Sequence, residues 1–133
     1  MSILADTSGL IALLDRDSTM HEAVRPYFDQ LLVPTTVLTE FDYLATRRIG
    51  PQVVRDFYRG VSRGEVAYLP VEAGDLKRAF EVLDQYHDAR IGLVDASIVA
   101  LAERYRLKRV LTLDRRHFAK FRPKGLEYLE LLP

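Results

Sequence analysis

The sequence contains no cysteine, no tryptophan and only two methionines among its 133 residues. Without cysteine the chain can form neither disulfide bonds nor thiolate metal sites, so any metal ligands must be oxygen or imidazole nitrogen atoms. No charge of one sign dominates, because 19 Lys and Arg residues balance 19 Asp and Glu residues. A neutral chain has no overall field to hold nucleic acid or an anionic membrane, so such contacts would depend on local patches.

Long hydrophobic runs are absent as well. No stretch approaches the roughly 20 apolar residues of a membrane-spanning helix, and the N-terminal apolar run stops at Asp6 without a preceding basic region. We therefore expect a soluble, cytoplasmic protein that lacks both a membrane segment and a secretory signal. The length and the 48% hydrophobic content predict a single domain spanning residues 1–133.

The apolar pattern alternates short buried runs with amphipathic helices. The predicted strands are residues 2–5, 31–33, 65–69, 108–113 and 128–132. The predicted helices are residues 10–14, 20–30, 37–49, 51–63, 73–86 and 93–105. Strands that alternate with helices need crossover connections, which predicts an α/β three-layer sandwich with a parallel sheet covered by helices on both faces.

Four acids occupy positions where this architecture binds ligands. Asp6 and Asp114 each follow a predicted strand. Asp95 falls in the first turn of a predicted helix, and Glu40 lies three residues after Val37 on the apolar stripe of another. Ligands bind outside the carboxyl ends of parallel strands, so these side chains are candidates for one shared site. Taken singly, each acid also has a plain alternative as a helix cap, a first-turn charge or a residue at the rim of its helix.

Together the four carboxylates predict a metal site. Like charges in a small volume repel one another, and a hard divalent cation removes that penalty. Oxygen ligands without thiolates favour Mg²⁺ or Mn²⁺ over Zn²⁺. Such a site supports attack of an activated water molecule on a phosphodiester bond.

The ordered motifs resemble those of PIN-domain ribonucleases, and specifically of the VapC toxins found in bacterial toxin–antitoxin modules. The matching stretches are Asp6-Thr7-Ser8-Gly9, Thr36-Val37-Leu38-Thr39-Glu40, Gly92-Leu93-Val94-Asp95-Ala96-Ser97-Ile98 and Leu111-Thr112-Leu113-Asp114-Arg115-Arg116-His117-Phe118. The resemblance implies that Asp6, Glu40, Asp95 and Asp114 are the acidic metal-binding quartet of the family. Many relatives carry a further acid at the position of His117.

The resemblance also implies a small, Rossmann-like parallel sheet of about four or five strands, a homodimer, and inhibition by a cognate VapB-type antitoxin. The expected activity is Mg²⁺- or Mn²⁺-dependent endoribonuclease cleavage of RNA. A nuclease with four carboxylates needs cations beside the metal to hold phosphate, and Arg115 and Arg116 directly follow Asp114. We expect these two arginines to contact substrate, and His117 to contact substrate or to transfer a proton. An unchanged cleavage rate in a His117→Ala variant would exclude both roles for His117.

Two other functions are compatible with acids at strand ends. A catalytically inactive binding module of the same fold would bind no divalent ion, which calorimetric titration with Mn²⁺ would reveal. A phosphoaspartyl protein, either a receiver domain or a phosphatase, needs a lysine near the acids, and phosphatases of this kind carry a second Asp two residues after the first. Here that position is Ser8, and Lys108 lies at the wrong end of its strand.

Overall fold

The computed structural model describes all residues, 1–133, and contains one five-stranded sheet. The strands are β1 (Ile3–Ala5), β2 (Leu31–Pro34), β3 (Ala67–Leu69), β4 (Arg109–Leu111) and β5 (Glu130–Leu132). All neighbours pair in parallel, in the order β3-β2-β1-β4-β5. The predicted parallel sheet is confirmed, although most of its strands are shorter than the apolar runs from which they were predicted.

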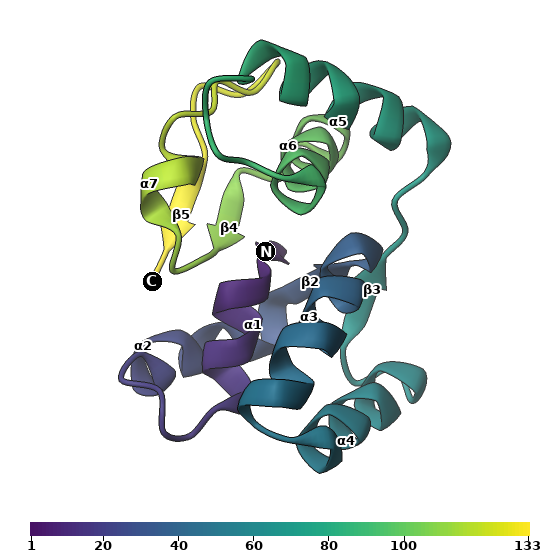
Figure 1. Cartoon of the computed structure of the whole chain (residues 1–133), viewed down its shortest axis with the longest axis vertical. Helices are drawn as coiled ribbons and strands as arrows, with labels where there is room; N and C mark the ends of the chain where they lie inside the picture. The colour runs from purple at the N-terminus through teal and green to yellow at the C-terminus, as the bar shows by residue number, and fades with distance from the viewer.

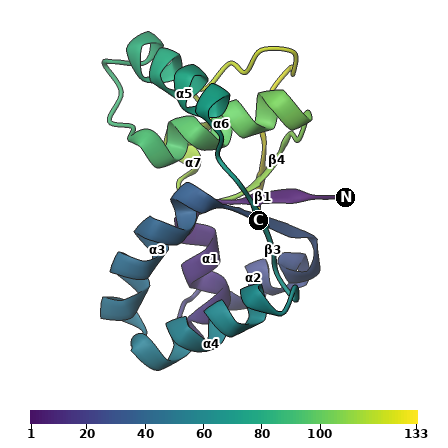
Figure 2. The ribbon, with the colours of Figure 1, turned by 90° about the vertical axis from the view of Figure 1, so that its right-hand side faces the viewer.

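Helices cover both faces of this sheet (Figures 1 and 2). The helices are α1 (Thr7–Leu14), α2 (His21–Val24), α3 (Thr35–Arg48), α4 (Pro51–Ser62), α5 (Ala73–Gln85), α6 (Leu93–Tyr105) and α7 (Arg115–Phe118). Figure 2 shows α1 to α4 on one side of β1 and α5 and α6 on the other. This arrangement confirms the predicted three-layer sandwich. None of these helices has both the length and the apolar character needed to cross a membrane.

The central strands are buried on both faces because helices cover them on both sides. Every residue of β1 is buried, and Val110 and Leu111 of β4 are fully shielded from solvent. At the edge of the sheet, β3 exposes Ala67 and Tyr68 instead. The centre of the core therefore lies along β1 and β4.

The expected helix over residues 20–30 is wrong in part. It divides into α2 and a 3-10 segment, η1 (Arg25–Gln30), with Pro26 at the start of that segment. Proline has no backbone N–H, so it cannot continue the hydrogen-bond ladder of the preceding helix. The break between α3 and α4 lies at Gly50, as expected. Its φ of 98° is a conformation that glycine adopts without steric cost, and Pro51 then starts α4.

The strand order places a topological switch point between β1 and β4. From β1 the chain builds outward through β2 to β3, whereas β4 and β5 lie on the other side of β1. Connections therefore leave β1 and β4 in different directions and open a crevice at their carboxyl ends. The register pairs Leu4 with Val110 and Ala5 with Leu111, so Asp6 lies beside Thr112 just past the paired residues.

Candidate active site

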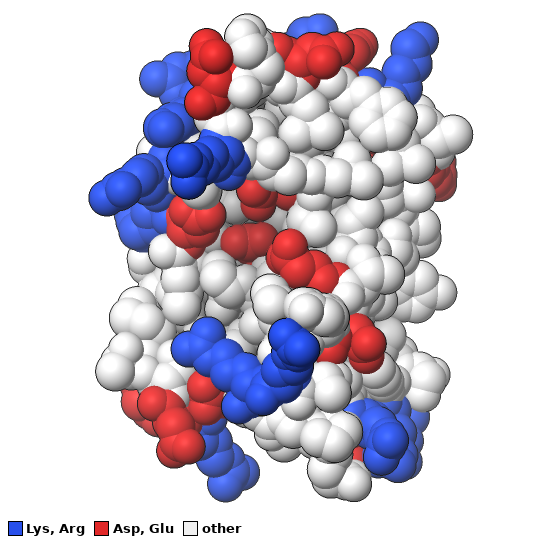
Figure 3. Space-filling model, in the orientation of Figure 1, with Lys and Arg blue, Asp and Glu red and all other residues white.

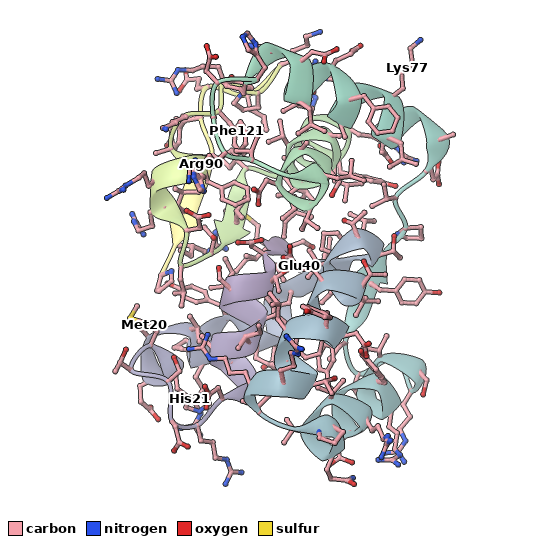
Figure 4. All side chains as sticks on the ribbon, viewed as in Figure 1. Met20, His21, Glu40, Lys77, Arg90 and Phe121 are labelled. Atoms are coloured by element: carbon pink, nitrogen blue, oxygen red, sulfur yellow. The ribbon has the colours of Figure 1, made fainter.

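The carboxyl edge of the sheet gathers the four acids found in the sequence. Figure 1 is viewed onto this edge, and Figure 3 shows acidic atoms in a hollow at the centre of the same view. Glu40 points from α3 toward this region in Figure 4. The charges of Asp6, Asp114 and Glu40 all act on Asp95, which brings the four segments into one electrostatic cluster.

Asp6 is the most firmly held member of the cluster. It is 5% exposed, and its Oδ2 atom accepts hydrogen bonds from Ser8 Oγ at 3.0 Å and from Thr112 Oγ1 at 2.7 Å. The same two hydroxyls accept the backbone N–H groups of Leu113 and Asp114, each at 2.9 Å. One hydroxyl network therefore ties the end of β1 to the loop that carries Asp114.

Asp114 has a second role in addition to its place in the cluster. It is the N-cap of α7 and accepts the backbone N–H of His117 at 3.4 Å. Its Oδ2 atom also lies 2.7 Å from the imidazole Nδ1 of His117. The capping alternative therefore holds for Asp114. It fails for Asp6, which occupies the N-cap position of α1 without making a side-chain cap bond.

Asp95 and Glu40 are positioned by contact between their helices. The hydroxyls of Thr36 on α3 and Ser97 on α6 lie 2.7 Å apart, and Ser97 donates its own proton to the carbonyl of Val94. Thr36 must therefore be the donor in the bond between the helices, since Ser97 has no second proton to give. This bond fixes the N-terminal parts of α3 and α6 next to each other.

The cluster carries negative charge that the protein does not neutralise. Burial raises the pKa of Asp95 to about 6, and the charges of Asp6, Asp114 and Glu40 add to the shift. Burial also raises the pKa of Asp6, against the opposing effect of its hydrogen bonds from Thr112 and Ser8. Asp6, Glu40 and Asp95 form no ion pair with Lys, Arg or His.

The acids form a looser cluster than the cage expected from the sequence. No three Asp, Glu or His side chains are gathered closely enough to hold one metal ion among them. Protein donors already engage one oxygen of Asp6, one of Asp95 and both of Asp114. Glu40 is exposed, so its expected place on the buried stripe of α3 is wrong.

The donor set nevertheless suits a hydrated hard cation. All its donor atoms are carboxylate oxygens. Burial, together with repulsion from the neighbouring acids, raises the pKa of Asp95, and a bound cation would offset the cost of its charge. Mg²⁺ usually keeps several water ligands and binds directly to only one or two carboxylates. An open acidic cluster of this kind fits Mg²⁺ or Mn²⁺ better than a metal that requires a closed protein cage.

The family of the chain follows from comparison with known proteins. The family model of the PIN domain matches residues 3–122. The chain belongs to the PIN-domain family. It is also 36% identical over 135 residues to Ribonuclease VapC26 of Mycobacterium tuberculosis, with 98% of this chain and 100% of that protein covered. The resemblance to VapC-type PIN domains noted in the sequence is thereby confirmed.

Solved structures share the same fold. The VapC20 toxin of M. tuberculosis, described as cleaving the sarcin-ricin loop, matches with a TM-score of 0.81 and 22% identity, covering 99% of this chain and 100% of that one. A toxin–antitoxin complex from Klebsiella pneumoniae contains a chain that matches with a TM-score of 0.69 and 20% identity, covering 96% of this chain and 98% of that one. The PIN-like architecture expected from the motifs is confirmed.

The basic residues beside the acids of this PIN domain differ in their availability. The guanidinium of Arg115 donates to the main-chain oxygens of Leu131 at 3.3 Å and Pro133 at 2.7 Å. Arg115 therefore holds the last strand against α7. Arg116 is exposed and forms neither a hydrogen bond nor an ion pair with the protein. Of the two arginines, only Arg116 has its whole guanidinium free.

Four hydroxyl residues that organise the acidic cluster were not identified from the sequence. Ser8 and Thr112 hold Asp6, while Thr36 and Ser97 join the helices that carry Glu40 and Asp95. A signal was present, because each of these residues lies within the motif of an acid. Serine and threonine are common at turns and caps, however, so their spacing alone does not separate site residues from local structure.

The raised pKa of Asp95 predicts a gain in stability on its neutralisation. Above pH 6 the Asp95 carboxylate is charged in both the folded and the unfolded protein, and burial of this charge destabilises the folded protein. The destabilisation disappears as the pH falls from 6 to 3.8, because the folded protein takes up a proton first. We expect Asp95→Asn to raise the free energy of unfolding above pH 6 by on the order of 1–2 kcal/mol, after allowance for solvent screening.

Urea unfolding without divalent ions at several pH values measures this effect. The exposed and unpaired Asp29 provides the control, since Asp29→Asn should leave stability nearly unchanged at every pH. A gain for Asp95→Asn that stayed constant from above pH 6 down to pH 3.8 would contradict the electrostatic origin.

Proposed function

We propose that the chain is a Mg²⁺- or Mn²⁺-dependent endoribonuclease toxin of the VapC type, with Asp6, Glu40, Asp95 and Asp114 at its active site. One observation carries the proposal: acids from four separate segments cluster at the switch point of the sheet, and three of them, Asp6, Glu40 and Asp95, have no cationic partner. The 36% identity to a protein named as a ribonuclease supports RNA as the substrate class.

The bound ion would supply Lewis-acid activation of a water molecule and charge neutralisation at the scissile phosphate. Asp6, Glu40, Asp95 and Asp114 would hold that ion, directly or through its water ligands. The hydroxyls of Ser8 and Thr112 keep the carboxylate of Asp6 in one orientation before substrate arrives. A site organised in advance does not need to rearrange its dipoles during the reaction.

Two residues beside the acids would orient a carboxylate and bind substrate. His117 is a positioning residue in this proposal, because its imidazole fixes Asp114. Arg116, whose guanidinium is free, would contact a phosphate of the RNA. In-line attack by water with departure of the 3′ oxygen would leave a 5′-phosphate and a 3′-hydroxyl.

The proposal also covers the inhibitor, the oligomeric state and the cellular location. The structural neighbours include a chain from a toxin–antitoxin complex, which supports a VapB-type antitoxin as the inhibitor. The proposal includes a homodimer, as the resemblance to VapC toxins implies, and light scattering of the purified chain would test it. A toxin that acts on cellular RNA would work in the cytoplasm.

The decisive experiment sequences the 5′ ends of RNA after incubation with the purified chain. We expect fragments with 5′-phosphate ends that require added Mg²⁺ or Mn²⁺ and that disappear with a chelator. The Asp6→Asn variant provides the control for contaminating ribonuclease. Cleavage that persists with the chelator, or that leaves 5′-hydroxyl ends, would contradict a metal-dependent mechanism.

A further inference from the structure

We propose that Arg90, in the loop between α5 and α6, joins Arg116 and Lys120 in a binding site for the sugar–phosphate backbone of RNA. This site lies on the α7 side of the acidic cluster. The inference rests on the proposed ribonuclease function and deepens it, because it specifies the side from which the RNA backbone approaches the acids. Arg90 comes from a segment that lies outside the acidic motifs.

The loop that carries Arg90 starts against the segment that follows α7. At one end, the Tyr86 hydroxyl accepts the backbone N–H of Arg122 at 2.8 Å, and the Tyr86 ring packs edge-on against Phe121 at 5.1 Å. At its other end the loop leads into α6, which carries Asp95 of the acidic cluster. Figure 4 shows the side chain of Arg90 over α7 in the view onto the carboxyl edge.

The three cations of this site have no acidic partner within the protein. Arg90, Arg116 and Lys120 are all exposed, and none forms an ion pair or a side-chain hydrogen bond. By contrast, Arg78 and Arg104 are paired with Glu103 and Asp75. Figure 3 shows blue side chains gathered over α7 next to the acidic hollow.

Phosphodiester anions match this arrangement. The acidic cluster repels the RNA backbone, and a single divalent ion can offset that repulsion only close to itself. Phosphates on either side of the scissile bond therefore need protein cations at the rim of the cluster. Arginine suits this role because its planar guanidinium donates two parallel hydrogen bonds to one phosphate.

Binding of a single-stranded RNA oligonucleotide to the Arg90→Gln variant tests the site. We measure affinity by fluorescence anisotropy over a salt series, with a chelator present and in an Asp95→Asn background, so that the RNA is not cut. We expect a loss of affinity of about three- to tenfold. The slope of log affinity against log salt should fall by about 0.7 for one lost phosphate contact. Arg116→Gln should behave in the same way.

Arg55→Gln is the matched control, because Arg55 is also exposed and unpaired but lies on α4. It should bind RNA as the parent does. The site is overturned if Arg90→Gln keeps the parent affinity and salt slope, or if Arg55→Gln loses as much. It is also overturned if Arg90→Gln impairs only the binding of an acidic protein partner. Failure of the parent chain to cleave RNA would refute the ribonuclease and not this binding surface, so the two failures are distinguishable.

Discussion

Asp95→Asn is expected to lower the rate of metal-dependent RNA cleavage by about a thousandfold, which is the scale of losing one preorganised electrostatic group. The change replaces one carboxylate oxygen by an amide and leaves the size of the side chain nearly the same. It removes a charge from the centre of the cluster, where Asp6, Asp114 and Glu40 all act on it. Cleavage of a labelled RNA at saturating Mn²⁺ measures the loss.

A measurement of stability distinguishes a loss of cleavage activity at the site from misfolding of the variant. The same substitution should make the metal-free protein more stable above pH 6, so an inactive variant would still be folded. The Asp29→Asn variant should retain full activity, because Asp29 is exposed and lies outside the acidic cluster. Full metal-dependent cleavage by Asp95→Asn would refute the assignment of the site.

Gly9→Ala is expected to lower the free energy of unfolding by about 3 kcal/mol, at the upper end of the cost of overpacking. A Cβ atom at Gly9 would lie 2.6 Å from the carbonyl oxygen and 2.9 Å from the carbonyl carbon of Leu111. Both atoms belong to the backbone of β4, so no change of rotamer relieves the clash. The first turn of α1 would have to move away from β4, and Asp6 would separate from Thr112. Urea unfolding and RNA cleavage should therefore both report the change.

Gly74→Ala is the control for the change of residue type. Gly74 lies in the first turn of α5, and a Cβ atom there meets nothing within 4 Å. Alanine favours a helix, so this variant should be unchanged or more stable by up to about 1 kcal/mol. Equal stability of the two variants would show that contact with Leu111 does not constrain α1.

The parallel sheet and its helical layers could be predicted because apolar periodicity reflects burial directly. Asp6 directly follows β1 and Asp114 lies three residues after the end of β4, so both acids lie at the carboxyl edge because the two strands run parallel. The buried stripe of α3 was predicted only in part. Val37, Phe41 and Ala45 are buried, but Leu44 is 41% exposed and Glu40 faces the open crevice. Helical spacing shows which residues share one face of a helix, but it does not show how much of that face the neighbouring elements cover.

Contacts between distant segments could not be predicted from spacing. The hydroxyl of Thr112 meets Asp6 only because β4 pairs with β1 in a particular register. Arg115 and Arg116 are identical in type and adjacent in sequence, yet one is used to hold the last strand and the other is free. The choice depends on which carbonyl groups lie nearby after folding, and that is a property of the tertiary structure.

The pairing of β1 with β4 also has a consequence during synthesis. Asp6 emerges early from the ribosome, whereas its hydrogen-bond partner Thr112 lies 106 positions later. Until β4 is made and pairs with β1, Asp6 lacks this hydrogen bond and the acidic cluster is not assembled. Under the proposed function, a growing chain or a proteolytic fragment that lacks β4 would therefore have no assembled active site.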